Sequence, residues 1–160
     1  MRGQLSIEFI IVLSGLLLII ATVSMPMYNQ ARADAEKISK LADAREAAVT
    51  LANATNTVYA AGVGSKQTIE YWLPQGVVSV SFVGGTENRL DVRIELNLES
   101  DNVVQVSTLL SENEDYVKVS GPIQTSPNYR VRHRTTLRHG YDTENKRSLI
   151  VINDQIIESV

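Results

Sequence analysis

The residue that first suggests chemistry is Glu8, a single acid at the edge of an apolar run. The fifteen residues from Phe9 to Val23 carry no charge and are nearly all apolar. A carboxylate within lipid costs on the order of 2–3 kcal/mol even on lenient scales, so it usually has a partner. Arg2 is a cation close by in the sequence, but it lies six residues away. The pattern therefore indicates that another group neutralises Glu8.

A cleavage just before the apolar run would create such a group. If the chain is cut between Gly3 and Gln4, the new α-amine of Gln4 lies four residues before Glu8, one helical turn away on the same face. In an assembly, the amine of one copy could neutralise Glu8 of its neighbour. Under this hypothesis Gly3 and Gln4 form a processing site, and Gln4 and Glu8 are the pair that sets the register of packed helices.

Two other interpretations of the run stay open. An ordinary secretory signal would use Arg2 as its positive region and would be cut after Ser24, although Ala-x-Ala is absent and Pro26 follows. A permanent anchor needs about 20 apolar residues, so the run would have to continue through Pro26 to Met27. In that alternative the chain is a single-pass membrane protein whose outer domain binds a partner without polymerising.

Residues Gly3-Gln4-Leu5-Ser6-Ile7-Glu8-Phe9 resemble the class III signal peptide of archaeal type IV pilin-like proteins. That motif is Gln-x-Ser-x-Glu, followed after three residues by Leu and preceded by a basic residue and Gly; Val12 stands here in place of the Leu. The segments Tyr59-Ala60-Ala61-Gly62 and Leu73-Pro74-Gln75-Gly76 add to the resemblance. It implies cleavage by a prepilin-type signal peptidase, after which the apolar segment stays in the mature protein.

The resemblance also implies an organisation of the chain. Residues 1–3 are then a leader, 4–27 a hydrophobic transmembrane and assembly helix, 28–62 an amphipathic continuation of that helix, and 66–160 an extracellular β-domain. The expected location is the cell membrane before assembly and a surface filament afterwards. The expected partners are the peptidase, the membrane, and other copies or related pilins.

The residues themselves predict the same long helix. Residues 28–61 are rich in Ala and contain neither Gly nor Pro, which gives high helix propensity. We predict one helix from about Leu5 to Ala61, kinked near Pro26 and ended by Gly62. Its second half carries apolar or small residues at spacings of three and four, the pattern of one buried face: Ile38, Leu41, Ala44, Ala48, Leu51, Thr55 and Val58.

After residue 65 the period of the apolar pattern changes to that of strands. Leu90, Val92 and Ile94 begin a strict alternation with charged residues, typical of a half-buried strand. The predicted strands are 68–73, 77–83, 90–98, 103–110, 115–119, 129–137 and 148–152, with Asn153-Asp154 turning the chain into a last short strand at 156–157. The fold class is therefore α+β: a long N-terminal helix followed by an antiparallel β-sandwich or open β-barrel.

The β-region offers a basic stretch but no catalytic pattern. Alternation places Arg130, Arg132 and Arg134 on one strand face, which is either solvated or a docking surface for acids of a neighbouring copy or for an anionic surface. His133 and His139 do not have zinc-ligand spacing. The segment 62–66 lacks the Gly-x4-Gly-Lys-Ser/Thr spacing of a phosphate loop and is better explained as a helix cap and linker.

Composition excludes several function classes. The net charge of −3 argues against a nucleic-acid binder, and the absence of cysteine rules out disulfides and thiolate metal sites. We predict no enzymatic activity and no cofactor. Asn53-Ala54-Thr55 is an N-glycosylation sequon, which makes Asn53 a candidate acceptor.

Overall fold

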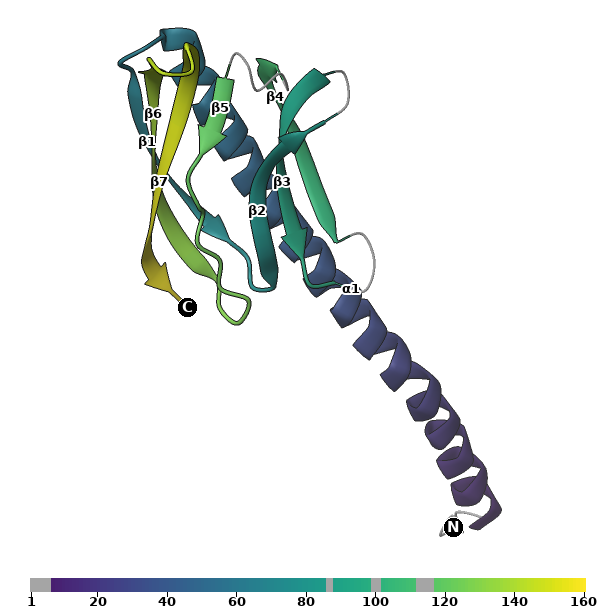
Figure 1. Cartoon of the computed structure of the whole chain (residues 1–160). Helices are drawn as coiled ribbons and strands as arrows, with labels where there is room; N and C mark the ends of the chain where they lie inside the picture. Colours follow the sequence, from purple (N-terminus) through teal and green to yellow (C-terminus); the bar gives the residue numbers. More distant parts are fainter. Residues whose placement is uncertain (1–6, 86–87, 99–101, 112–116) are drawn as a thin grey trace. The chain divides into compact units, whose positions relative to one another are not determined.

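The computed structural model describes residues 7–85, 88–98, 102–111 and 117–160. It confirms the α+β fold class: one helix, α1 (Ile7–Ala61), is followed by seven described strands in two sheets (Figure 1). The chain divides into two compact units, Met1–Ser39 and Lys40–Val160, and the boundary falls within α1.

The helix continues through Pro26, where the sequence predicts a kink. Proline has no N–H to donate to the carbonyl four residues earlier, which would be that of Thr22. All residues around Pro26 are nevertheless helical. The hydroxyl of Thr22 donates to the carbonyl oxygens of Leu18 (3.0 Å) and Ile19 (2.9 Å) within the same helix. The unbroken helix thus keeps the apolar run and the Ala-rich region in one element.

The predicted helical face is confirmed from Ala44 onward. The buried residues of α1 are Ala44, Ala47, Ala48, Leu51, Ala52, Ala54, Thr55 and Val58. Leu41 is partly buried against the same core. Ile38, which the spacing placed on this face, is 67% exposed and belongs to the first unit. Small alanines dominate the buried face, so the helix backbone approaches the sheets closely.

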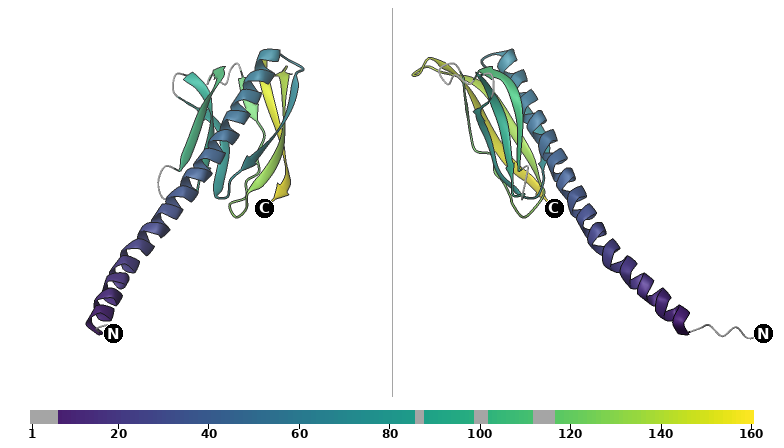
Figure 2. Two further views of the ribbon diagram at one scale, coloured as in Figure 1. Left: turned by 180° about the vertical axis from the view of Figure 1, so that it is seen from behind. Right: turned by 90° about the vertical axis from the view of Figure 1, so that its right-hand side faces the viewer.

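The strands form two open sheets. One has the order β1 (Lys66–Leu73), β6 (Val131–Asp142), β7 (Arg147–Ser159), β5 (Val117–Ser120), and the other has the order β2 (Val77–Gly84), β3 (Arg89–Leu96), β4 (Val103–Ser111). Every pair is antiparallel except β5 and β7, which run parallel, unlike the all-antiparallel prediction. The part of α1 after Ser39 lies across the same side of both sheets (Figure 2).

One hydrophobic core joins this part of the helix to both sheets. Leu51 and Val58 of α1 share it with Leu73 of β1, Ile94 of β3 and Ile150 of β7, all of which are almost inaccessible to solvent. Burial of each such side chain contributes roughly 1.5–3 kcal/mol. The helix therefore supplies the second layer that each half-buried sheet requires.

The predicted turn at Asn153-Asp154 is wrong. β7 passes straight through these residues and pairs with β6 along its length, so that Asn153 lies opposite Thr136 and Asp154 opposite Thr135. The hairpin turn is at residues 143–146 instead, where the carboxylate of Asp142 accepts from the N–H of Asn145 (3.2 Å). Two consecutive polar residues are typical of a turn. Here, however, the carboxylate of Asp154 accepts a hydrogen bond from the buried His133.

Candidate functional site

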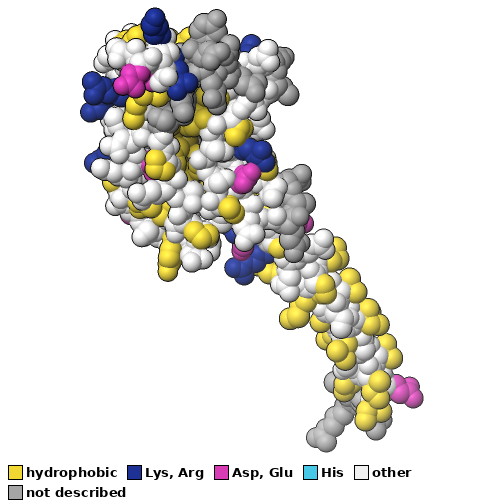
Figure 3. Space-filling model, viewed as in Figure 1, with side chains coloured by type: hydrophobic (Ala, Val, Ile, Leu, Met, Phe, Trp, Pro, Cys, Tyr) yellow, Lys and Arg dark blue, Asp and Glu magenta, His cyan; other side chains and the backbone are white. Residues whose placement is uncertain are grey.

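The first candidate site is the N-terminal part of α1, which carries apolar side chains on all sides. Fifteen large apolar side chains between Ile7 and Tyr28 are 43–74% exposed. Figure 3 shows hydrophobic side chains covering this segment. A helix that is apolar all round is stable only when apolar groups surround it. Leaving this surface in water would cost on the order of 20 kcal/mol.

By length and composition this segment can cross a membrane. Residues 7–28 extend about 33 Å as a helix, close to the thickness of the hydrocarbon core of a bilayer. Among the described residues α1 is the one helix that meets this criterion, and its apolar window is not covered by the rest of the protein. The segment is therefore a membrane anchor or a signal sequence.

Glu8 lies in the first turn of α1 and is exposed. It makes no hydrogen bond or ion pair with any residue that the structure describes. A carboxylate at this end of a helix is favoured by the helix dipole, by roughly 0.3–1 kcal/mol. The other predicted residues of this region, Gly3 and Gln4, lie outside the described residues.

Gly15 lies in the interior of α1, where no contact within the described residues requires a glycine. Glycine destabilises a helix interior by about 1 kcal/mol relative to alanine. A Cβ built at Gly15 meets no atom within 4 Å, so none of the residues that the structure describes requires a glycine at this position. Ser14, the preceding residue, is also small and exposed. In apolar helices, small residues allow a second helix to approach closely.

The second candidate site is the predicted arginine surface. Arg132 and Arg134 point outward from β6, and both bind Glu70 of the adjacent strand β1, each at 2.8 Å. Arg132 also lies 3.8 Å from Glu158 of β7. These guanidinium groups hold the pKa of Glu70 below its usual value, the hydrogen bond from Arg134 contributing most. Within the described part of the chain, these two arginines already have acidic partners.

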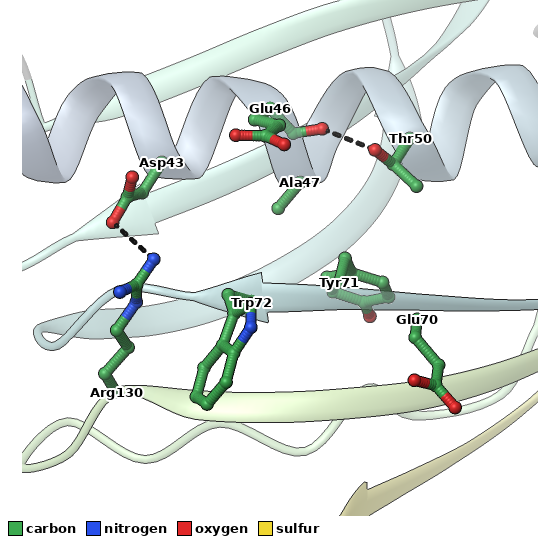
Figure 4. Close-up of a pocket in the computed structure, with 8 residues that line it drawn as sticks. All are labelled: Asp43, Glu46, Ala47, Thr50, Glu70, Tyr71, Trp72 and Arg130. Atoms are coloured by element: carbon green, nitrogen blue, oxygen red, sulfur yellow. Dashed lines mark hydrogen bonds and ion pairs between the residues drawn. The ribbon is translucent and has the colours of Figure 1, made fainter. Parts of the chain in front are cut away.

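Arg130 borders a pocket instead. It precedes β6, binds Asp43 of α1 at 3.3 Å, and places its guanidinium 5.0 Å from the ring centroid of Trp72. The pocket has a volume of about 210 Å³ (Figure 4). Its lining is Asp43, Glu46, Ala47, Thr50, Glu70, Tyr71, Trp72 and Arg130. The pocket is lined by both acidic and basic side chains. The ion pair between Arg130 and Asp43 links the start of β6 to α1.

A buried polar cluster, which sequence reasoning missed, lies behind this surface. The carboxylate of Asp154 accepts from Nδ1 of His133 (2.8 Å), from the backbone N–H of Gln124 (3.1 Å) and from the hydroxyl of Thr135. Thr135 is 3.2 Å from the hydroxyl of Tyr71. Since Thr135 has one proton and gives it to Asp154, the hydroxyl of Tyr71 donates to Thr135. The ring of Tyr71 stacks on that of His133, with centroids 5.4 Å apart.

Burial and charge set the ionisation of this cluster. Burial alone would raise the pKa of Asp154, but the hydrogen bonds from His133, Thr135 and Gln124 outweigh it, so this pKa lies below its ordinary value. Burial raises the pKa of the Tyr71 hydroxyl well above its usual range. Because the histidine and aspartate side chains are fully buried, the cluster stabilises the sheet and is inaccessible to a substrate.

A sequence signal for this cluster existed. His133, Thr135 and His139 have the same parity along β6 as Val131 and Leu137, and all five are buried. His139 lies apart from the cluster, with Nδ1 3.3 Å from the carbonyl oxygen of Val58 and its ring stacked on Tyr59. No group of three or more potential metal ligands occurs among the residues described.

The remaining predicted sites lie on the helix and after it. Asn53 is exposed, but Thr55 of the same sequon is buried and its hydroxyl donates to the carbonyl oxygen of Leu51 (2.8 Å). The segment 62–66 is the expected helix end and linker: the N–H of Gly62, at φ +83°, donates to the carbonyl oxygen of Tyr59 (3.1 Å).

Comparison with protein-family models, curated protein sequences and solved structures finds no match to this chain.

Proposed function

We propose that this protein is a pilin-like subunit of an archaeal type IV-like surface filament. The observation that carries the proposal is the bare apolar segment of α1 with one acid, Glu8, in its first turn. Such a surface needs an apolar surrounding, which the membrane supplies before assembly and neighbouring copies supply afterwards. The same helix carries this apolar segment at one end and residues of the β-region's core at the other. This arrangement suits a subunit that polymerises through one end.

The class III motif supports a specific processing step. A prepilin-type signal peptidase would cut between Gly3 and Gln4, and the apolar segment would remain in the mature subunit. The α-amine of Gln4 would then neutralise Glu8 of an adjacent copy, and the open space at Gly15 would admit a neighbouring helix. Arg130, Arg132 and Arg134 remain a candidate docking surface toward a neighbouring subunit.

The alternative is a single-pass anchor whose β-region binds a partner without polymerising. The length and exposure of the apolar helix suit this function equally. The two functions differ in the mature N-terminus and in the state of the assembled protein. Intact mass measurement, allowing for a cyclised Gln4, should give a chain that starts at residue 4. A chain that retains Met1 would favour the anchor.

The decisive variant is Glu8→Gln, which removes the charge and keeps the size of the side chain. We expect unchanged cleavage and at least tenfold fewer filaments in a host that carries the assembly machinery, because burying an unpaired amine costs about 1–3 kcal/mol or more. Asp34→Asn is the matched control, since Asp34 is an exposed acid of the same helix beyond the apolar segment. Normal filaments from the Glu8 variant would refute the register role.

A further inference from the structure

The outward face of the first sheet carries side chains in regular rows across β1, β6 and β7, which lie side by side (Figure 1). Each row joins one residue from each strand by register. The rows are Lys66–Arg138–Val151, Thr68–Thr136–Asn153, Glu70–Arg134–Gln155 and Trp72–Arg132–Glu158.

The charges in these rows are balanced at one end and unbalanced at the other. Glu70 and Glu158 neutralise the two arginines of the last two rows. In the first row, Lys66 and Arg138 are directly opposite each other, and both are exposed. Neither has an ion pair with an acid among the residues the structure describes. Like charges placed directly opposite on paired strands are destabilising, and no acid of the described residues offsets this repulsion with an ion pair.

The unbalanced row borders an open hollow of about 490 Å³. Its lining is Gly64, Lys66, Thr136, Arg138, Val151 and Asn153. No acidic side chain is among these residues, so the polar groups that face the hollow are mainly donors. We propose that this hollow, here called the Lys66–Arg138 site, binds a saccharide that carries an oxyanion, such as a carboxylate, sulfate or phosphate group.

The two cations would hold the oxyanion. The guanidinium of Arg138 is a planar fork that matches two oxygens of a carboxylate or phosphate, and the ammonium of Lys66 adds a second positive charge. The hydroxyl of Thr136 is 3.0 Å from that of Thr68. When Thr68 donates in that bond, the proton of Thr136 is available for a ligand oxygen.

The other lining residues fit a sugar better than a bare anion. The side-chain amide of Asn153 can both donate to and accept from hydroxyl groups. Val151 is 40% exposed and offers an apolar contact for a ring face. A volume of about 490 Å³ falls in the range of small-molecule sites, roughly 300–1,000 Å³, and exceeds what an inorganic anion fills. The site is independent of the filament proposal, because it lies on the β-region and needs no second copy.

Binding to the full-length chain in detergent micelles tests this proposal. The probes are an oligogalacturonate, a phosphorylated hexose, a sulfated hexose, a neutral galactose oligomer and inorganic phosphate, each titrated at low salt. We expect one of the acidic saccharides to bind and Arg138→Gln to weaken its binding at least tenfold. Lys66→Gln should also weaken binding. Arg134→Gln is the matched control, because Arg134 lies two rows away and is already paired with Glu70; it should leave binding unchanged.

Thermal unfolding gives an independent readout of the same variants. Removing either charge of the first row should leave the melting temperature unchanged or raise it at low salt, because repulsion is relieved. Loss of binding in a variant that melts normally therefore supports the site. The proposal is overturned if acidic saccharides bind more weakly than about 10 mM, or if Arg138→Gln and Lys66→Gln leave their affinity unchanged.

Three further outcomes also overturn it. Equal affinity for inorganic phosphate would mean a free-anion site, and equal affinity for the neutral oligomer would mean that the charge plays no part. Self-association of the chain that is lost in Arg138→Gln, without saccharide binding, would mean that a second copy occupies this surface.

Discussion

The buried carboxylate of Asp154 is expected to stabilise the β-region, and Asp154→Ala tests this. The side chain is almost inaccessible and accepts three hydrogen bonds, from His133, Thr135 and the backbone of Gln124. Removing it leaves the buried His133 ring without its acceptor and takes one from the N–H of Gln124, while the Thr135 hydroxyl can turn to the hydroxyl of Tyr71. Breaking a buried pair of this kind costs about 3–5 kcal/mol, so we expect a loss of stability of that size.

Asp154→Asn separates charge from shape. The amide keeps one oxygen as an acceptor but points an NH₂ group at a former donor, so we expect a smaller loss, about 1–3 kcal/mol. Asp142→Ala is a matched control. Asp142 also accepts several hydrogen bonds, from Glu144 and Asn145, but it lies in an exposed turn where water can replace them. Its loss of stability should be much the smaller.

The pH dependence gives a second test of the same residue. The pKa of Asp154 is lower in the folded than in the unfolded chain. Its contribution to stability is therefore full above the unfolded value, near 3.9, and is lost as the pH falls through the folded pKa. The difference in stability between the wild-type chain and Asp154→Asn should shrink in acid, as the pH falls through the folded pKa of Asp154.

Denaturant unfolding of the full chain in detergent, followed by the fluorescence of Trp72, the single tryptophan, measures these effects. Trp72 lies at the pocket beside α1, so its emission should report separation of the helix from the sheet. The reasoning fails if Asp154→Ala loses less than about 1 kcal/mol, or if the difference from Asp154→Asn does not change with pH.

Three further predictions concern the core, one glycine and one surface ion pair. Leu51→Ala should lose about 2–5 kcal/mol, because Leu51 is fully buried between α1 and the sheets; a loss below about 1 kcal/mol in denaturant unfolding would contradict this packing. Gly121→Ala should lose roughly 1–3 kcal/mol or more in the same assay, since Gly121 has φ +129° and an added Cβ would clash with the carbonyl group of Ile152; unchanged stability would show that this geometry is wrong. Glu70→Gln should lower the melting temperature slightly at low salt and not at high salt, because its two arginine partners are exposed; a large effect that persists in high salt would be inconsistent with a solvated pair.

The sequence was most informative where a regular apolar pattern continues over many residues. The helix end at Ala61 was predicted because Gly62 follows an uninterrupted Ala-rich stretch, and the alternation at Val92 and Ile94 located β3 correctly. These signals are local: they depend on a residue and its neighbours within one or two turns. The helix continues through Pro26, as the single long helix predicted across this residue requires, and the kink there stays a prediction.

The sequence was least informative where polar residues are buried and form hydrogen bonds with one another. Asn153 and Asp154 have the composition of a turn, yet β7 continues through them because they pair with Thr136 and Thr135 in the middle of β6. His133 and Thr135 looked like parts of a basic, polar strand. Their partner Asp154 lies about twenty residues further on, and no local pattern indicates that the three side chains meet.

What the sequence by itself determined is the arrangement of kinds of surface along the chain: an apolar segment with one acid, a helix with one buried face, and alternating strands. These follow from composition and period, which each segment carries alone. Only the tertiary structure decided the pairing of charges across strands. Register placed Glu70 between Arg132 and Arg134, and left Lys66 and Arg138 opposite each other without an acid in the described chain. Pairing depends on which strands become neighbours, and that is a property of the whole fold.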